Sequence, residues 1–171
     1  MTVSPATVAS LQTGATQQFT AQAKLSDGSI SSTDIEWSVT GGGAISASGL
    51  YTAPGAPQTA DITVTASRGG KSGSAVISEI VSPPPTIVAK AAISGKVGGS
   101  TTAFTTMFTA TNSAASDYNF VVTPTEAGTV SAAGLLTLAD TANGDVTVKA
   151  THKTVTSVTA TATLTGVVPK S

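Results

Sequence analysis

The sequence predicts an all-β protein built from two tandem β-sandwiches, and three observations support this. Residues 43–54 (GAISASGLYTAP) recur as residues 128–139 (GTVSAAGLLTLA), 85 positions later. That spacing exceeds the roughly 20 to 50 residues of solenoid repeats and suits a small domain. Apolar residues alternate with polar ones, mostly threonine, as in half-buried strands. Finally, Ser82 is followed by three consecutive prolines, which favour an extended boundary segment.

Further short sequences recur in the second half at nearly the same spacing. Phe19-Thr-Ala recurs at Phe108, and the Trp37-x-Val-Thr sequence has its counterpart at Phe120. The order of these landmarks is the same in both halves, which indicates duplication with small changes in loop length. We therefore expect a first domain over residues 1–81, a Pro-rich linker over 82–86 and a second domain over 87–171.

Strands are expected in each half wherever the alternation is clear. In the first half these are residues 19–25, 35–39, 62–66 and 75–80, and in the second half 120–122, 146–150 and 158–164. Asp27-Gly28 and the Gly-Gly pair after Arg68 predict turns, and Asn143-Gly144 is a strong tight-turn dipeptide. No segment shows a helical period. Short strands separated by frequent turns are typical of a sandwich.

Composition excludes several classes of function. The 171 residues include no cysteine, only 10% are charged, and the formal net charge is −1. A disulfide framework is therefore absent, and no basic patch predicts a nucleic-acid partner. No apolar run approaches the length of a membrane span, so membrane insertion is not expected. Because Met1 is not followed by a secretory signal, we expect a chain that is made in the cytoplasm.

The repeated Gly-Leu-x-Thr motif has a structural interpretation. Gly49 and Gly134 are expected to take positive φ in tight turns, and Leu50 and Leu135 to point into the core. The alternative is a ligand-binding loop.

Aromatic residues supply the other candidate positions. Phe19, Phe108 and Phe120 are expected in the cores, and Trp37 between the two sheets, with an exposed sugar-stacking platform as its alternative. Tyr51 is the candidate for a binding surface, because it could end a strand near the solvent.

A catalytic or metal site is hard to assemble from the remaining residues. His152 is the only histidine, and a serine triad would have to combine it with Asp140 or Asp145. No nucleophile elbow accompanies it. The carboxylates are dispersed, and even Asp34 and Glu36 flank a core position. Asp140, Asn143 and Asp145 offer oxygen ligands for calcium, but their spacing differs from an EF-hand loop. We therefore expect no enzyme activity, no cofactor and no bound metal.

Several segments together resemble the bacterial immunoglobulin-like domains of the Big type. They are Val3-Ser-Pro, the run from Gly14 to Ala21, Trp37-Ser-Val-Thr, and the Gly49-Leu-Tyr-Thr-Ala-Pro sequence. The first half is similar throughout, whereas the second has Phe120 in place of the tryptophan and Leu-Ala in place of Ala-Pro. The resemblance implies two Ig-like Greek-key sandwiches without disulfides, in a module that displays, spaces or binds rather than catalyses.

This resemblance leads to two functional expectations. The first is a tailed-phage virion protein, a capsid or tail decoration assembled in the host cytoplasm. One domain would dock on a capsid or tail protein while the other projects, with homo-oligomers and weak contact with bacterial surface carbohydrate as further expectations. The irregular residues 91–106 favour the second domain for docking, although the reverse polarity is an alternative. The second expectation is a spacer or adhesion pair from a large bacterial cell-surface or secreted protein.

Overall fold

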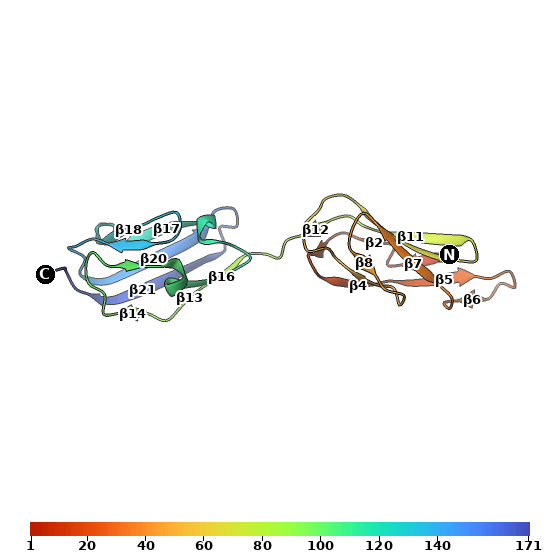
Figure 1. Ribbon diagram of the computed structural model, residues 1–171, viewed down its shortest axis with the longest axis horizontal. Helices are drawn as coiled ribbons and strands as arrows, with labels where there is room; N and C mark the ends of the chain where they lie inside the picture. Colours follow the sequence, from red (N-terminus) through yellow and green to blue (C-terminus); the bar gives the residue numbers. More distant parts are fainter. The chain divides into compact units, whose positions relative to one another are not determined.

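The computed structural model describes residues 1–171, which divide into two compact units, Met1–Pro83 (unit 1) and Pro84–Ser171 (unit 2) (Figure 1). The division falls inside the run of prolines. The expected linker over residues 82–86 is one residue too long, because Thr86 already belongs to the first strand of unit 2 and pairs with Thr111. Each unit closes its own hydrophobic core.

Unit 1 consists of strands joined by short turns. The strands are β1 (Thr2–Ser4), β2 (Thr7–Val8), β3 (Leu11–Gln12), β4 (Thr16–Gln18), β5 (Thr20–Lys24), β6 (Ile30–Ser31), β7 (Glu36–Thr40), β8 (Ala44–Ile45), β9 (Leu50–Thr52), β10 (Ile62–Arg68), β11 (Lys71–Ile77) and β12 (Ile80–Val81). A four-stranded sheet has the order β2-β11-β10-β7. Three smaller groups, β1-β5-β6, β4-β9-β8 and β12-β3, complete the unit.

Unit 2 repeats this plan. Its elements are β13 (Thr86–Ala89), β14 (Ile93–Ser94), β15 (Thr101–Thr102), α1 (Phe104–Met107), β16 (Phe108–Thr111), η1 (Ala115–Asp117), β17 (Tyr118–Thr123), η2 (Thr125–Ala127), β18 (Gly128–Val130), β19 (Leu136–Leu138), β20 (Gly144–His152) and β21 (Thr159–Val167). The four-stranded sheet is β14-β21-β20-β17, accompanied by β15-β19-β18 and β13-β16.

The two units share the same parallel pairing. In each, a short early strand lies parallel to the last long strand, β2 beside β11 and β14 beside β21, whereas the long pairs β10·β11 and β20·β21 are antiparallel. The chain crosses repeatedly between the strand groups of each unit, as in an Ig-like Greek key. The fold is therefore the predicted pair of all-β sandwiches.

Alternation along the strands produces the cores. In β10, Ile62, Val64 and Ala66 are completely buried while the intervening residues are partly exposed, and β20 buries Val146 and Val148 in the same way. Leu25 departs from the pattern expected for residues 19–25. It is 36% exposed, because β5 ends at Lys24 and the chain then turns away from the core.

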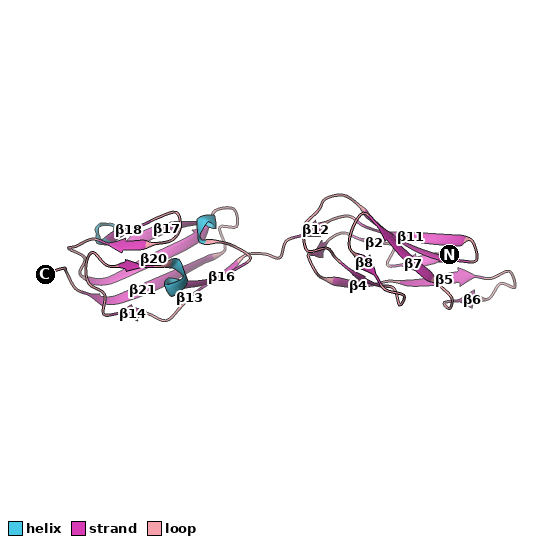
Figure 2. Cartoon of the chain, viewed as in Figure 1, coloured by secondary structure: helices cyan, strands magenta, loops and turns pink.

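Three further details differ from expectation. The closing strand of unit 1 starts at Lys71 rather than residue 75, because Gly69 and Gly70 both take positive φ and make the turn very tight. Ile80 belongs to β12, which pairs with β3 instead of continuing β11. A short helix, α1, interrupts unit 2, and two 3₁₀ turns accompany it (Figure 2). Four residues are too few to produce a detectable helical period. With four residues in α1 and three in each 3₁₀ turn, none of the helices could span a membrane.

Candidate functional site

The repeated Gly-Leu motif forms the same turn in both units. Gly49 and Gly134 have φ of +80° and +74°, the positive values that the sequence predicted. In unit 1, the Gly49 and Leu50 amides donate to the backbone oxygen and Oγ of Ser46, at 3.0 and 3.1 Å. Ser131 accepts the equivalent bonds in unit 2 at 2.8 and 3.2 Å. The motif is thus a serine-anchored turn, and its hydrogen bonds remain within the chain.

The leucines of the motif do not point into the core. Leu50 and Leu135 are 39% and 42% exposed, whereas the residues after them, Tyr51 and Leu136, are completely buried. A strand pleat sends successive side chains to opposite faces, so an error of one position reverses the assignment. Pairing fixes the phase here, because Tyr51 lies opposite the half-buried Gln17 of β4. The expectation for both leucines was wrong by one residue.

Tyr51 is a core residue and not part of a binding surface. Its ring is fully buried, and its hydroxyl donates to the Gly42 carbonyl at 3.2 Å. Burial raises the pKa of the Tyr51 hydroxyl above its usual value, because the phenolate would lose its hydration. The sequence interpretation failed because a tyrosine next to a turn has the same pattern whether its ring points inward or outward.

The buried hydroxyl predicts a loss of stability in alkali. A raised pKa in the folded state means that the neutral form stabilises unit 1 fully below the unfolded value of about 10, and that this stability is lost as pH rises through the folded pKa. Urea titrations of the parent and Tyr51→Phe, followed by fluorescence, would measure this. Above the unfolded pKa, the free energy of unfolding should fall more steeply with pH for the parent than for Tyr51→Phe. Equal slopes for the two proteins would contradict the prediction.

An aromatic ring packs against the repeated glycine in each unit, but the ring comes from a different element in the two units. A Cβ added to Gly49 would lie 3.0 Å from the indole of Trp37, on β7. At Gly134 it would lie 2.7 Å from Phe104, on α1. Phe120, which occupies the position equivalent to Trp37, instead packs edge-on against Phe104 with ring centroids 6.0 Å apart. The phenylalanine on α1 therefore replaces the missing tryptophan of unit 2.

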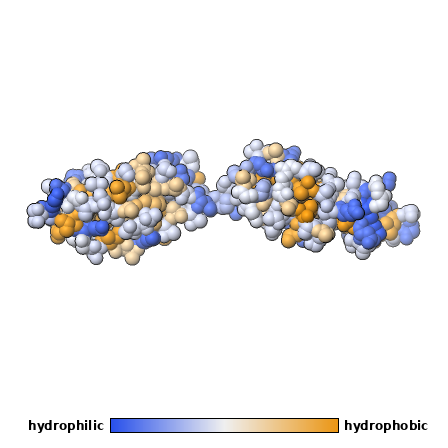
Figure 3. Space-filling view, in the orientation of Figure 1, coloured by the Kyte–Doolittle hydropathy of each residue, from blue (hydrophilic) through white to orange (hydrophobic).

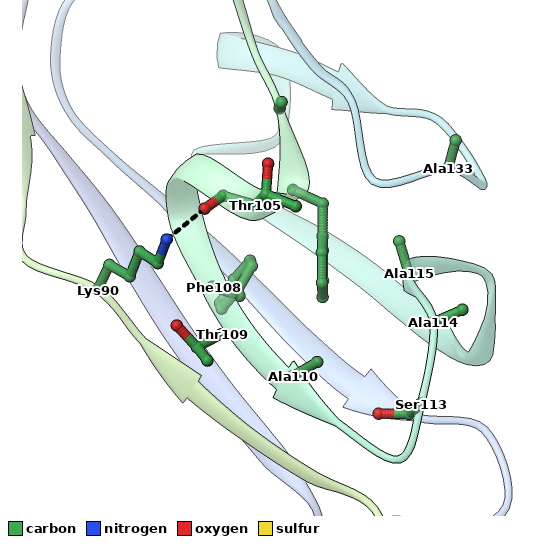
Figure 4. Close-up of a pocket in the computed structure, with 11 residues that line it drawn as sticks. Lys90, Thr105, Phe108, Thr109, Ala110, Ser113, Ala114, Ala115 and Ala133 are labelled. Atoms are coloured by element: carbon green, nitrogen blue, oxygen red, sulfur yellow. Dashed lines mark hydrogen bonds between the residues drawn. The ribbon is translucent and has the colours of Figure 1, made fainter.

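A hollow of about 510 Å³ lies beside α1, and we call it the α1 pocket (Figure 4). Phe104 and Phe108 contribute its aromatic part, and small residues, among them Ala110 and Ala133, form much of the rest. Its one charged residue, Lys90, donates from Nζ to the Thr105 carbonyl at 2.6 Å. The pocket thus offers apolar surface, with its ammonium group already engaged.

A second hollow, the Trp37 groove of about 330 Å³, lies on unit 1. Trp37 is partly buried rather than enclosed between the sheets, because β7 is the edge of its four-stranded sheet. The groove combines the indole with the Thr20, Ser32 and Ser48 side chains and the carboxylate of Asp34. The Trp37 groove is more polar than the α1 pocket. Sequence alternation places Trp37 toward the core, but it does not show that the sheet edge at β7 stays uncovered.

The other expected core rings are placed as follows. Phe19 and Phe108 are buried, at 0% and 1% exposure, and Phe120 is partly buried against the core of unit 2. Of the seven aromatic residues in the chain, Trp37 and Phe120 are thus the two that retain appreciable exposure.

Three of the residues considered for catalysis or calcium, His152, Asp145 and Asp140, interact with near neighbours. Nδ1 of His152 accepts hydrogen bonds from the backbone amides of Thr154 and Val155, at 3.3 and 3.2 Å. Asp145 accepts the Gly166 amide at 2.9 Å. Asp140 lies 3.9 Å from the Lys170 ammonium. No group of three histidine or acidic side chains in the structure is arranged to hold a metal ion.

Comparison with known proteins gives only structural similarity. No family model matches the chain, and no curated protein sequence matches it. Among solved structures, invasin, a bacterial integrin-binding protein, is 16% identical over 96% of this chain, with a TM-score of 0.38. Domains 1–6 of the surface layer protein SbsC are 14% identical over 93%, with a TM-score of 0.40. Mouse cadherin-23 EC22–24 is 16% identical over 99%, with a TM-score of 0.38. The chain spans 37%, 26% and 63% of these three structures, respectively.

Proposed function

We propose that this chain is a non-enzymatic structural and display protein of a tailed-phage virion, in which one unit docks on a capsid or tail protein and the other projects. The observation that carries the proposal is that the domain is duplicated and that the two copies do not have a binding or catalytic site in common. Two sandwiches of the same topology each close a separate core, and His152, Asp145 and Asp140 interact with their own neighbours. We assign these units a display role because no assembled site points to chemistry, and function is argued from a site rather than from a fold.

The second part of the proposal concerns weak contact with bacterial surface carbohydrate. Tyr51 is unavailable because it is buried, so the Trp37 groove is the surface that we assign to this contact. An indole face packs against the C–H groups of a sugar ring, while hydroxyl and carboxylate oxygens hydrogen-bond to its hydroxyl groups. Trp37, Ser48 and Asp34 provide these groups within one groove.

Mass spectrometry of purified particles tests the proposed location. We expect peptides of this chain in gradient-purified phage particles and their absence from extracts of the host cell surface. Detection of these peptides only inside a longer secreted chain would overturn the virion proposal.

Lysine acetylation of intact particles then identifies the docked unit, because Lys24 and Lys71 report on unit 1 while Lys149 and Lys153 report on unit 2. The docked unit should show protection relative to the free protein.

The alternative function is a spacer or adhesion pair within a larger bacterial surface protein. The feature that favours it is the duplication itself, since two copies of one domain joined through consecutive prolines suit a spacer. The same mass measurement separates the two functions.

A further inference from the structure

A third hollow on unit 1 is lined by residues at the β5–β6 and β10–β11 turns. These turns lie at the end of the unit remote from β12 (Figure 1). The hollow has a volume of about 600 Å³. We call it the cationic hollow and define it by Met1, Ala23, Lys24, Leu25, Arg68 and Lys71. Three of the chain's eight basic residues thus line one hollow, and no acidic residue lines it. Hydrophilic surface gathers at this end of the unit (Figure 3).

The two lysines of the hollow lack partners within the chain, unlike most of the other lysines, whereas Arg68 forms an ion pair with Asp34. Lys90, Lys96 and Lys153 each donate to a backbone carbonyl, and Lys170 lies beside Asp140. No hydrogen bond or ion pair engages the ammonium groups of Lys24 and Lys71. Cationic charge that is free of internal partners is available to an external anion.

Arg68 adds an unsatisfied donor at the same place. Its Nη2 donates to Asp34 at 3.1 Å, which holds the guanidinium in position, and its side chain is 22% exposed. Nη1 is buried and has no hydrogen-bond partner. A buried unpaired donor is costly, so an acceptor that reached it would recover stability. A guanidinium also matches the paired oxygens of a carboxylate.

The acidic residue nearest in sequence does not neutralise the hollow. Asp27 lies in the β5–β6 turn, where its Oδ1 accepts the amide of Ser29 at 2.9 Å and the hydroxyl of Ser29 at 2.6 Å. These bonds from Ser29 hold the pKa of Asp27 below its usual value. The carboxylate is thus committed to its own turn.

Apolar surface beside the cations favours a ligand that carries aliphatic groups as well as negative charge. Leu25 is 36% exposed within the hollow, and Ile30, which is 66% exposed, pairs with Lys24 across the β5–β6 hairpin. Directly paired residues project from the same face of a hairpin. In addition, β6 is the edge of its sheet, so its outer backbone groups are open to an extended chain. A polypeptide provides carboxylates, aliphatic side chains and backbone partners together.

From this geometry we infer that the cationic hollow, with Ile30 at its margin, is a docking site for an acidic segment of a partner protein that carries an aliphatic residue beside its carboxylates. This inference goes beyond the proposed function, since it holds for a particle protein and for a cell-surface protein alike.

The test is a titration of the ¹⁵N-labelled full chain with the peptide acetyl-Gly-Glu-Leu-Glu-Gly-amide, followed by amide chemical shifts. We expect saturable shifts confined to residues 23–31 and 68–72, with affinity that falls as salt is added. Lys24→Gln combined with Lys71→Gln should weaken binding about tenfold. The matched control, Lys149→Gln with Lys170→Gln, changes net charge equally but lies in unit 2, and its affinity should stay within about twofold.

Two further ligands decide what the site recognises. If the analogue with glutamine in place of both glutamates binds equally well, the contact is apolar and the inference is overturned. If inorganic phosphate shifts the same amides and competes as strongly as the peptide, the hollow is a simple anion site and the polypeptide assignment is wrong. The absence of saturable shifts with the glutamate peptide would also overturn it. None of these outcomes depends on whether the protein is found on a phage particle.

Discussion

Replacing Gly49 with alanine is expected to destabilise unit 1 by about 3 kcal/mol, a large part of the roughly 5 to 15 kcal/mol that stabilises a typical domain. Two effects add. The φ of +80° is unfavourable for any residue with a Cβ. The new Cβ would also lie 2.5 Å from the Phe19 carbonyl oxygen and 3.0 Å from the Trp37 ring. The Phe19 oxygen is held by the Gln18 side-chain amide at 2.7 Å, so it has little freedom to retreat.

Gly14→Ala is the matched control for this substitution. Gly14 has a similar φ of +72°, but a Cβ there would have no neighbour within 4 Å. It should therefore cost only the backbone term of about 1 to 2 kcal/mol. Trp37 is the only tryptophan, so its fluorescence during urea unfolding reports on unit 1. Equal effects of the two substitutions would show that the close packing around Gly49 contributes nothing.

Replacing Phe104 with alanine is expected to destabilise unit 2 by about 3 to 5 kcal/mol while leaving unit 1 unchanged. Phe104 is 8% exposed, and its ring centroid lies 5.3 Å from that of Phe108 and 5.9 Å from that of Tyr118. It also supports the turn at Gly134. Removing the ring therefore leaves a cavity that several elements line, and the small helix α1 has no other aromatic residue with which to fill it.

Two optical signals separate the units in this experiment. Circular dichroism follows the strands of both units, whereas Trp37 fluorescence follows unit 1 alone. Phe104→Ala should therefore shift part of the unfolding transition seen by circular dichroism and leave the transition seen by fluorescence unchanged. Val88→Ala is the control, because Val88 is 64% exposed in the same unit and its loss should change stability by less than about 0.5 kcal/mol. A parallel shift of the fluorescence transition would mean that the units share stability.

The candidate surfaces could be predicted less well than the fold, for a reason that the two Gly-Leu turns illustrate. Positive φ at Gly49 follows from local sterics, so the motif predicts it directly. Whether Leu50 or Tyr51 faces the core depends on how β9 packs between its two partners, and one of them, β4, lies more than thirty residues away in the sequence. The candidate binding residue was therefore assigned to the wrong face.

The cationic hollow shows the same limit more clearly. Lys24 lies on β5, while Arg68 and Lys71 lie on either side of the β10–β11 turn. Nothing in their spacing indicates a common site. Their proximity arises because the β1-β5-β6 group and the four-stranded sheet end at the same side of the sandwich. A low overall charge conceals such a local concentration, since net charge says nothing about position.

The sequence by itself determined the duplication, the proline boundary, the all-β class and most strand positions, because these depend on repeats, turn residues and a period of two along the chain. Only the tertiary structure decided which face each alternating series presents, that Tyr51 is buried and Trp37 partly open, and that Phe104 on α1 takes over the support of Gly134. These properties depend on contacts between distant strands, and local periodicity carries no information about the partner across the core.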